Sequence, residues 1–184
     1  MQTMLRTRTL ASRRPFAGRI LNLRVDTIQI ADHPPVEREI IEHPGSVVIV
    51  PITDRSTVLL VRQWRHATED ELLEAPAGHI DPGESPEAAA QRELQEETGH
   101  RADRLIKLSE FWIAPGWCTE YMYAYLALGL SASRLDQDID EDVGVEEVAL
   151  AQVPALITSG AIRDAKTIGT LLLATCLWKD KVDV

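Results

Sequence analysis

The strongest constraint on the fold is a helix whose two ends are both marked in the sequence, over residues 86–98. Ser85 is a residue type that caps helix N-termini, and Pro86 follows at the first helical position, where its missing N–H costs nothing. Gly99 suits the left-handed conformation that ends many helices. These local signals predict a helix from Pro86 to about Thr98.

Three glutamates of this helix share one face. Glu93, Glu96 and Glu97 occupy positions i, i+3 and i+4, where like charges repel by roughly 0.2–0.5 kcal/mol per pair. Arg92 is the nearest cation, and the sequence offers no equal number of cations at helical spacing. Most glutamate-rich helices only present a solvated face to water. Hard divalent cations, which take oxygen ligands, are the functional explanation for such a cluster.

Strands are expected on both sides of this helix along the chain. Residues 46–52 and 57–62 are nearly continuous aliphatic runs, which is typical of a sheet covered on both faces. Further strands are expected at 72–75, 105–111, 120–128 and 145–149, and two helices at 153–159 and 164–179. Strands and helices that alternate in this way predict an α/β protein, with an α/β/α sandwich around a mixed β-sheet.

The N-terminal segment, residues 1–43, has a different character. Six arginines and no acidic residue precede Asp26. Such a start is compatible with an organelle transit peptide or with a tail that touches a membrane or nucleic acid. We favour a short basic tail leading into antiparallel strands at 18–30 and 36–42, because apolar and polar residues alternate there. The chain thus divides into this tail and β segment and a main domain over residues 44–184.

Composition excludes several partners. The net charge of −10 argues against nucleic-acid binding, which needs a cationic surface. The longest apolar stretch, residues 168–178, is far shorter than the roughly 20 residues of a membrane span, so no membrane partner is expected. Cys118 and Cys176 have no disulfide-like or metal-like spacing, which favours a reducing, cytoplasmic location. An acidic protein that acts on an anionic substrate needs cations between the two.

A fixed pattern surrounds the glutamate cluster. It comprises Gly78, Glu84, Arg92, Glu93, Leu94, Glu96, Glu97 and Gly99. This pattern resembles the signature of the Nudix hydrolases at every position but the last, where the family has an aliphatic residue and this chain has His100. With eight residues matched at fixed spacing, the resemblance is specific. It implies a Nudix fold with an N-terminal antiparallel β segment.

The resemblance also implies a Mg²⁺ site, with Mn²⁺ as a substitute. Glu93 and Glu97 become the principal ligands, Glu96 a further ligand, and the backbone carbonyl of Ala77 completes the site. Glu96 and Glu97 thereby belong to the catalytic group. Glu84 and Arg92 are expected to pair and lock the loop onto the helix, with Gly78 and Gly99 as structural positions at its ends. Metals at such a site neutralise developing charge and activate a water for in-line attack at phosphorus.

Four segments resemble the ADP-ribose pyrophosphatase branch of the family. They are residues 62–65 (RQWR), 71–78 (ELLEAPAG), 114–116 (APG) and 164–167 (DAKT). Together with the signature, the likeness covers roughly residues 37–175. Relatives that act on GDP-mannose or other nucleoside diphosphate sugars share several of these features.

This branch implies substrate contacts at residues outside the signature. Arg65 is the candidate phosphate clamp, because a guanidinium fork matches diphosphate oxygens, although an exposed loop arginine is an equal alternative. Glu120 corresponds to a position near the terminal ribose, or is a solvent-facing strand residue. Arg38 corresponds to a residue near the adenosine, and Pro115 has the spacing associated with ADP-ribose hydrolases. For Trp117 we favour a loop-filling role over stacking on a base.

The acidic run from Asp136 to Asp142 has two readings as well. Most acidic loops are solvated and have no function. In this branch, however, an acidic loop at this place supplies the general base. We expect Glu141 to be that base, with Asp140 and Asp142 as alternates.

The sequence as a whole predicts Mg²⁺-dependent hydrolysis of ADP-ribose to AMP and ribose 5-phosphate. The resemblance implies a homodimer, with the β segment at residues 17–43 packed against or swapped onto a second subunit. One alternative is a pyrophosphatase for another nucleoside diphosphate sugar, such as GDP-mannose. A second alternative is a sensor that binds ADP-ribose-like ligands without turnover, which the three glutamates of the signature disfavour.

Overall fold

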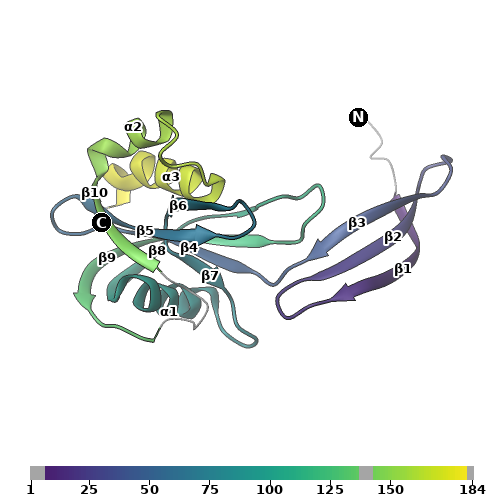
Figure 1. Ribbon diagram of the computed structural model, residues 1–184, viewed down its shortest axis with the longest axis horizontal. Coiled ribbons are helices and arrows are strands. Elements are labelled where there is room, and N and C mark those ends of the chain that lie inside the picture. Colours follow the sequence, from purple (N-terminus) through teal and green to yellow (C-terminus); the bar gives the residue numbers. More distant parts are fainter. Residues whose placement is uncertain (1–6, 137–142, 182–184) are drawn as a thin grey trace. The chain divides into compact units, whose positions relative to one another are not determined.

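The computed structural model describes residues 7–136 and 143–181 (Figure 1). The chain forms two compact units, which are described separately. The first contains the residues up to Gly45 together with Trp112–Tyr121, and the second contains Ser46–Phe111 and the chain from Met122 onward. Within the described residues, no helix is both long and apolar enough to cross a bilayer.

The N-terminal unit is built on a three-stranded antiparallel sheet. Its strands are β1 (Thr7–Ala17), β2 (Asn22–Ile30) and β3 (Val36–Glu42), in the order β1-β2-β3. The turn between β1 and β2 is closed by a hydrogen bond from Gly18 N to the Leu21 carbonyl, 2.9 Å long. The strand predicted over 18–30 is therefore shorter, and the predicted β3 is present.

The expectation of a basic tail before this sheet was wrong for residues 7–17, which form strand β1. Every residue of β1 is exposed, so the strand has no buried face and no apolar alternation to reveal it. Its arginines pair across the sheet instead. Arg13 reaches Glu37 at 3.2 Å and Arg14 reaches Glu42 at 2.8 Å.

Within its described residues, the second unit combines two sheets with three α-helices and one short 3-10 helix. The four-stranded sheet has the order β7-β4-β9-β8, and β4 runs parallel to β9 but antiparallel to β7. The three-stranded sheet has the order β10-β5-β6 and is antiparallel. The strands are β4 (Ser46–Pro51), β5 (Thr57–Arg65), β6 (Asp70–Glu74), β7 (Ala77–His79), β8 (His100–Trp112), β9 (Tyr121–Ala132) and β10 (Val143–Ala149). The predicted mixed sheet and α/β class are confirmed.

Strand β4 is covered on both faces, as its aliphatic run predicts. Val48 and Val50 belong to a core cluster that includes residues of β5, β9 and the C-terminal helix α3 (Ala165–Lys181). The alternate residues Val47 and Ile49 pack in a second cluster with Ala89, Ala90 and Leu94 of helix α1 (Pro86–Thr98). Figure 1 shows α1 on one side of these strands and α2 (Val153–Thr158) and α3 on the other.

Helix α1 has the predicted bounds. The Ser85 Oγ accepts a hydrogen bond from Ala88 N at 3.2 Å, and Pro86 occupies the first turn. Gly99 has φ 71°, the left-handed region, and its N–H donates to the Gln95 carbonyl at 3.1 Å. Both ends are thus fixed by local interactions, and the glutamate face is held at a defined orientation to the loop before it.

Candidate active site

The loop that leads into α1 touches the helix at one glycine. A Cβ built on Gly78 would lie 2.0 Å from Glu93 Oε1 and 2.0 Å from Glu93 Cδ. Contacts of this length do not occur in folded proteins, so any side chain at position 78 would displace the Glu93 carboxylate. Gly78 does not have a left-handed φ, so backbone conformation does not demand a glycine at this position. The glycine is required because the Glu93 side chain lies so close to its Cα.

Arg92 fastens the same loop to the helix. Its Nε and Nη2 donate to the Glu84 carboxylate at 3.1 and 3.0 Å, and Nη2 also donates to the His79 carbonyl at 2.8 Å. The hydrogen bond from Arg92 lowers the pKa of Glu84. The pair expected from the signature is therefore present, and it ties both ends of the loop to one guanidinium.

The remaining terminal nitrogen of Arg92 faces the glutamate cluster. Nη1 donates to Glu93 Oε1 at 2.7 Å and to Glu96 Oε2 at 2.8 Å. Burial alone would lower the pKa of Arg92, but hydrogen bonds to Glu84 and Glu93 and the charge of Glu93 raise it instead. Arg92 thus occupies the position of a shared cation between two of the carboxylates.

Glu97 is the most buried of the three glutamates, with 1% of its surface exposed. Its Oε2 accepts a hydrogen bond from Ala77 N at 2.9 Å. Glu93 is also buried, at 7% exposure. Buried carboxylates are costly unless cations or hydrogen bonds satisfy them. The contact is made by the N–H of Ala77, whereas the expected metal ligand is its carbonyl, so the metal role of Ala77 stays a prediction.

These residues suit a hard cation in their chemistry. The donors are carboxylate oxygens and a backbone segment, which are the ligands that Mg²⁺ takes. Within the described residues, no three His, Cys, Asp or Glu side chains already converge on one metal position. Arg92 engages one oxygen each of Glu93 and Glu96, so the second oxygen of each carboxylate is left out of these two hydrogen bonds.

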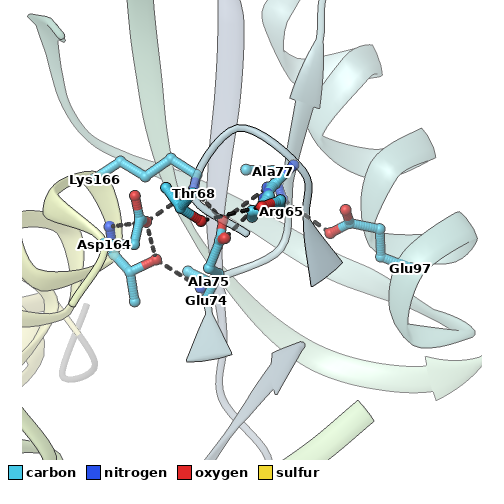
Figure 2. A network of polar contacts seen from close by, with 9 residues as sticks. Arg65, Thr68, Glu74, Ala75, Ala77, Glu97, Asp164 and Lys166 are labelled. Carbon is cyan, nitrogen blue, oxygen red and sulfur yellow. Dashed lines mark hydrogen bonds and ion pairs between the residues drawn. The ribbon is translucent and has the colours of Figure 1, made fainter. Parts of the chain in front are cut away.

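Arg65 lies at the end of β5 and is held by Glu74, as Figure 2 shows. Its Nε and Nη2 donate to the two Glu74 oxygens at 2.8 and 2.7 Å, and the Glu74 hydrogen bond raises the pKa of Arg65. The side chain is 37% exposed. Arg65 is therefore neither a freely rotating surface arginine nor fully enclosed.

The N-terminal unit contains a partly open pocket of about 320 Å³. It brings together the predicted substrate residues Arg38 and Pro115, and its lining is Arg24, Arg38, Ile40, Trp112, Pro115, Gly116, Trp117, Cys118 and Thr119. Trp117 is 59% exposed, so the loop-filling role expected for it was wrong. Trp117 also belongs to the lining of the pocket.

The two pocket arginines differ in their partners. Arg24 donates to Asp26 at 3.1 Å and to Glu42 at 2.6 Å. Arg38 donates only to the Glu37 carbonyl at 3.1 Å and has no carboxylate partner among the described residues. The charge of Arg38 is therefore available to an anionic or polar ligand.

Two predicted residues fall outside these clusters. Glu120 is half-buried in the same loop as Pro115, where its carbonyl accepts from Ile113 N at 3.2 Å, but it does not line the pocket. Glu141, the predicted base, lies outside the described residues, as do its alternates Asp140 and Asp142.

Several residues of the Arg65 network and of the pocket were not predicted from the sequence. Glu74 and Lys166 lie in segments noted for their resemblance, yet no role was expected for either. The available signal for Glu74 was its position directly after Leu72 and Leu73 at the end of β6. Arg24 and Trp112 were missed because nothing in their local sequence marks a pocket.

Comparison with known proteins supports the same family. The NUDIX domain pattern matches residues 42–170. The chain is 37% identical to an ADP-ribose pyrophosphatase of Bacillus subtilis over 165 residues, which is 89% of each chain. It is 34% identical to a methanol dehydrogenase activator of Bacillus methanolicus, over 91% of this chain and 92% of that one.

A solved structure extends this likeness to three dimensions. The crystal structure of an ADP compounds hydrolase superposes with a TM-score of 0.89 over 100% of both chains, at 26% sequence identity. The family pattern, the glutamate face of α1 and the glycine loop locked onto it by Arg92 all agree. The chain belongs to the Nudix hydrolase family.

Proposed function

We propose that this protein hydrolyses ADP-ribose to AMP and ribose 5-phosphate with Mg²⁺. The observation that carries the proposal is the face of α1, where Glu93, Glu96 and Glu97 lie against the Gly78 loop. The name of the Bacillus subtilis relative, which matches over 89% of each chain, supports ADP-ribose as the substrate.

The metal is assigned to Glu93, Glu96, Glu97 and the Ala77 carbonyl. When bound there, Mg²⁺ neutralises charge on the diphosphate and makes a water molecule more acidic. The chain's own groups hold the carboxylates in place. Ala77 N fixes Glu97, and Arg92 fixes Glu93 and Glu96 on one side.

Four residues are assigned to the substrate. Arg65 binds the diphosphate, because a guanidinium matches phosphate oxygens. Arg38 and Pro115 contact the adenosine, and Glu120 the terminal ribose. The pocket that contains Arg38 and Pro115 also presents Trp117, whose aromatic face suits a base.

The reaction itself is a displacement at phosphorus. The oxygen of water bonds to one phosphorus, and the bond from that phosphorus to the bridging oxygen breaks. The water proton passes to the Glu141 carboxylate, and the leaving phosphate oxygen departs with its negative charge. Two phosphomonoesters, AMP and ribose 5-phosphate, are the products.

A hydrolysis panel tests this proposal. The substrates are ADP-ribose, ADP-glucose, GDP-mannose, NADH, a diadenosine polyphosphate and a nucleoside triphosphate, each with Mg²⁺ and with products separated by chromatography. We expect preference for ADP-ribose and release of AMP. Preference for GDP-mannose would retain the reaction and overturn the substrate. Binding of ADP-ribose without turnover of any compound would favour a regulatory role. The Bacillus methanolicus relative, named a methanol dehydrogenase activator, carries a name of that kind.

We also propose that the protein is a homodimer that works in the cytoplasm. The N-terminal sheet exposes apolar side chains on its own surface, namely Leu10, Phe16, Ile20, Leu21 and Val36. A three-stranded sheet with so little buried surface needs a partner surface, and a second copy supplies it. Light scattering should give twice the chain mass, and an active monomer would overturn the proposal. Both cysteines are free, in accord with a reducing compartment.

A further inference from the structure

Glu74 is a buried carboxylate between two cations. It ends strand β6 and has 1% of its surface exposed. Arg65 donates to both of its oxygens, and Lys166 Nζ forms an ion pair with Oε2. Burial would raise the pKa of the Glu74 carboxyl, but the hydrogen bonds from Arg65 and the charges of Lys166 and Arg65 hold it below its ordinary value. Glu74 is therefore an anion in the folded protein.

The start of helix α3 completes this network (Figure 2). Asp164 Oδ2 accepts from Lys166 Nζ at 2.8 Å and from Thr167 N and Oγ1 at 3.0 and 2.5 Å. The network thus contains two carboxylates and two cations, and its formal charge is zero. Loss of either carboxylate would leave one cation uncompensated in a largely buried place.

The same network reaches the backbone that precedes the signature. Thr167 is fully buried, and its Oγ1 accepts a hydrogen bond from Ala75 N at 2.8 Å. The next carbonyl, of Pro76, accepts from Ile49 N at 2.8 Å, and Ala77 N donates to Glu97. Three successive residues after Glu74 are therefore fixed from three different elements.

Arg65 is the most exposed of the four charged residues in the network, with 37% of its side-chain surface open to solvent. Its carbonyl accepts from Thr68 N and Oγ1 at 3.0 and 3.1 Å, so its backbone is held by a turn. Glu74 engages the edge formed by Nε and Nη2. A guanidinium has five N–H groups in a planar fork, and Nη1 has no acceptor among the described residues. The second edge of the fork is thus left for a ligand.

We propose that Glu74 is a positioning residue, which grips one edge of Arg65 so that the other edge meets the diphosphate of the substrate. This inference rests on the proposed function, because it assigns Arg65 to the diphosphate. Lys166 and Asp164 keep Glu74 in place and balance its charge.

Stability alone is a poor explanation for the arrangement. Buried ion pairs cost desolvation, and apolar residues of similar volume often replace them without loss of stability. A two-point contact between a carboxylate and a guanidinium also fixes orientation, because the planes of the two groups are held relative to each other. An arginine that is already oriented loses less side-chain entropy when it binds a ligand.

A double-mutant cycle tests the proposal on the full-length protein. Glu74→Gln keeps the size of the side chain and removes its charge, and it is made in wild-type and Arg65→Ala backgrounds. Glu71→Gln is the matched control, because Glu71 is an exposed glutamate of the same strand. Each protein is assayed for kcat and KM with ADP-ribose and Mg²⁺, and for thermal unfolding. The Kd for ADP-ribose is measured by calorimetry without divalent cations.

We expect Glu74→Gln to lower kcat/KM and to weaken binding by about tenfold in the wild-type background, the scale of one misdirected charge-assisted hydrogen bond. In the Arg65→Ala background the same change should have an effect of less than about twofold, because its effect passes through Arg65. The Glu71→Gln control should match wild type. If Glu74→Gln does not fold, Glu74→Asp, which retracts the carboxylate by one methylene, replaces it in both backgrounds.

Two outcomes would overturn the positioning role. One is a Glu74 variant with wild-type kcat/KM and Kd, and the other is an equal loss in both backgrounds, which marks a general structural effect. Failure of the proposed function is a separate result. In that case the wild-type protein does not turn over ADP-ribose, and the cycle is decided by the calorimetric Kd values.

Discussion

Replacement of Gly78 by alanine tests the central geometry of the site. The added Cβ would lie 2.0 Å from Glu93 Oε1 and 2.3 Å from Glu93 Oε2. Carbon–oxygen contacts below about 3 Å are strongly repulsive, so the carboxylate must move by about 1 Å or more. The atom that moves is at the end of a flexible side chain, and the backbone can stay where it is. The free energy of unfolding should therefore fall by only about 1 kcal/mol, near the low end of the usual cost of overpacking.

The effect on catalysis should be much larger than the effect on stability. A displacement of about 1 Å in a catalytic group can cost about 100-fold in rate. The displaced Glu93 would also lose its hydrogen bond from Arg92 Nη1, now 2.7 Å long. We expect kcat/KM for the Mg²⁺-dependent reaction to fall by about 100-fold. The thermal midpoint should fall by about 2–4 °C, which corresponds to 1 kcal/mol in a chain of this size.

Gly169→Ala is the matched control. Gly169 lies within helix α3, and a Cβ there would meet nothing within 4 Å. The same chemical change should therefore stabilise the protein, by up to about 1 kcal/mol, because alanine is the better helix former. Activity close to wild type in Gly78→Ala would refute the reasoning, and so would a loss of stability without a loss of activity.

Three further predictions follow from contacts in the structure. Glu97→Gln should lower Mg²⁺-dependent turnover by at least about 100-fold. Its melting curve should stay near that of the wild type, because the amide oxygen can still accept from Ala77 N. Near-normal turnover would contradict the metal role. Arg92→Lys should destabilise the protein by about 1–3 kcal/mol in denaturant titrations, since a lysine cannot reproduce the two bonds to Glu84; an unchanged midpoint would show that the pair is dispensable. The pKa of Glu42 is lowered to about 2 by a hydrogen bond from Arg14, so its contribution to the N-terminal sheet is complete above about pH 4.5 and is lost as the pH falls toward 2. The protection factors of the β3 amides, which correct for the slower intrinsic exchange at acid pH, should decrease over that interval. They should decrease less in Arg14→Gln, where only Arg24 remains to pair with Glu42.

Local signals were sufficient for the part of the site that is contiguous in sequence. The bounds of α1 were predicted correctly because Ser85 and Gly99 act within one turn of the helix ends. The Glu84–Arg92 contact joins residues that are eight apart, and the signature fixes their spacing. Such interactions depend little on the rest of the fold.

Long-range contacts were not predictable in the same way. Strand β1 was missed because Arg14 gains its partner from Glu42, 28 residues away, and no buried face marks the strand. The Glu74–Lys166 and Ala75–Thr167 contacts each span 92 residues. Both segments were marked by their resemblance, but their pairing was not predicted, because the charge of a glutamate does not reveal which cation will face it after folding.

The arginines of this acidic chain have two different uses, and the structure separates them by their partners. Carboxylates hold Arg65 at two nitrogens and Arg92 at three, so their positive charge is largely compensated and their orientation is fixed before any ligand arrives. Arg38 has no carboxylate partner among the described residues and retains its full charge at a pocket. A fixed guanidinium contributes geometry to binding, because little side-chain entropy remains to be lost. A free guanidinium contributes electrostatic attraction, which salt screens. An acidic protein that binds an anionic substrate needs both, since its net charge of −10 opposes the approach of the substrate and the reaction requires a defined alignment at phosphorus.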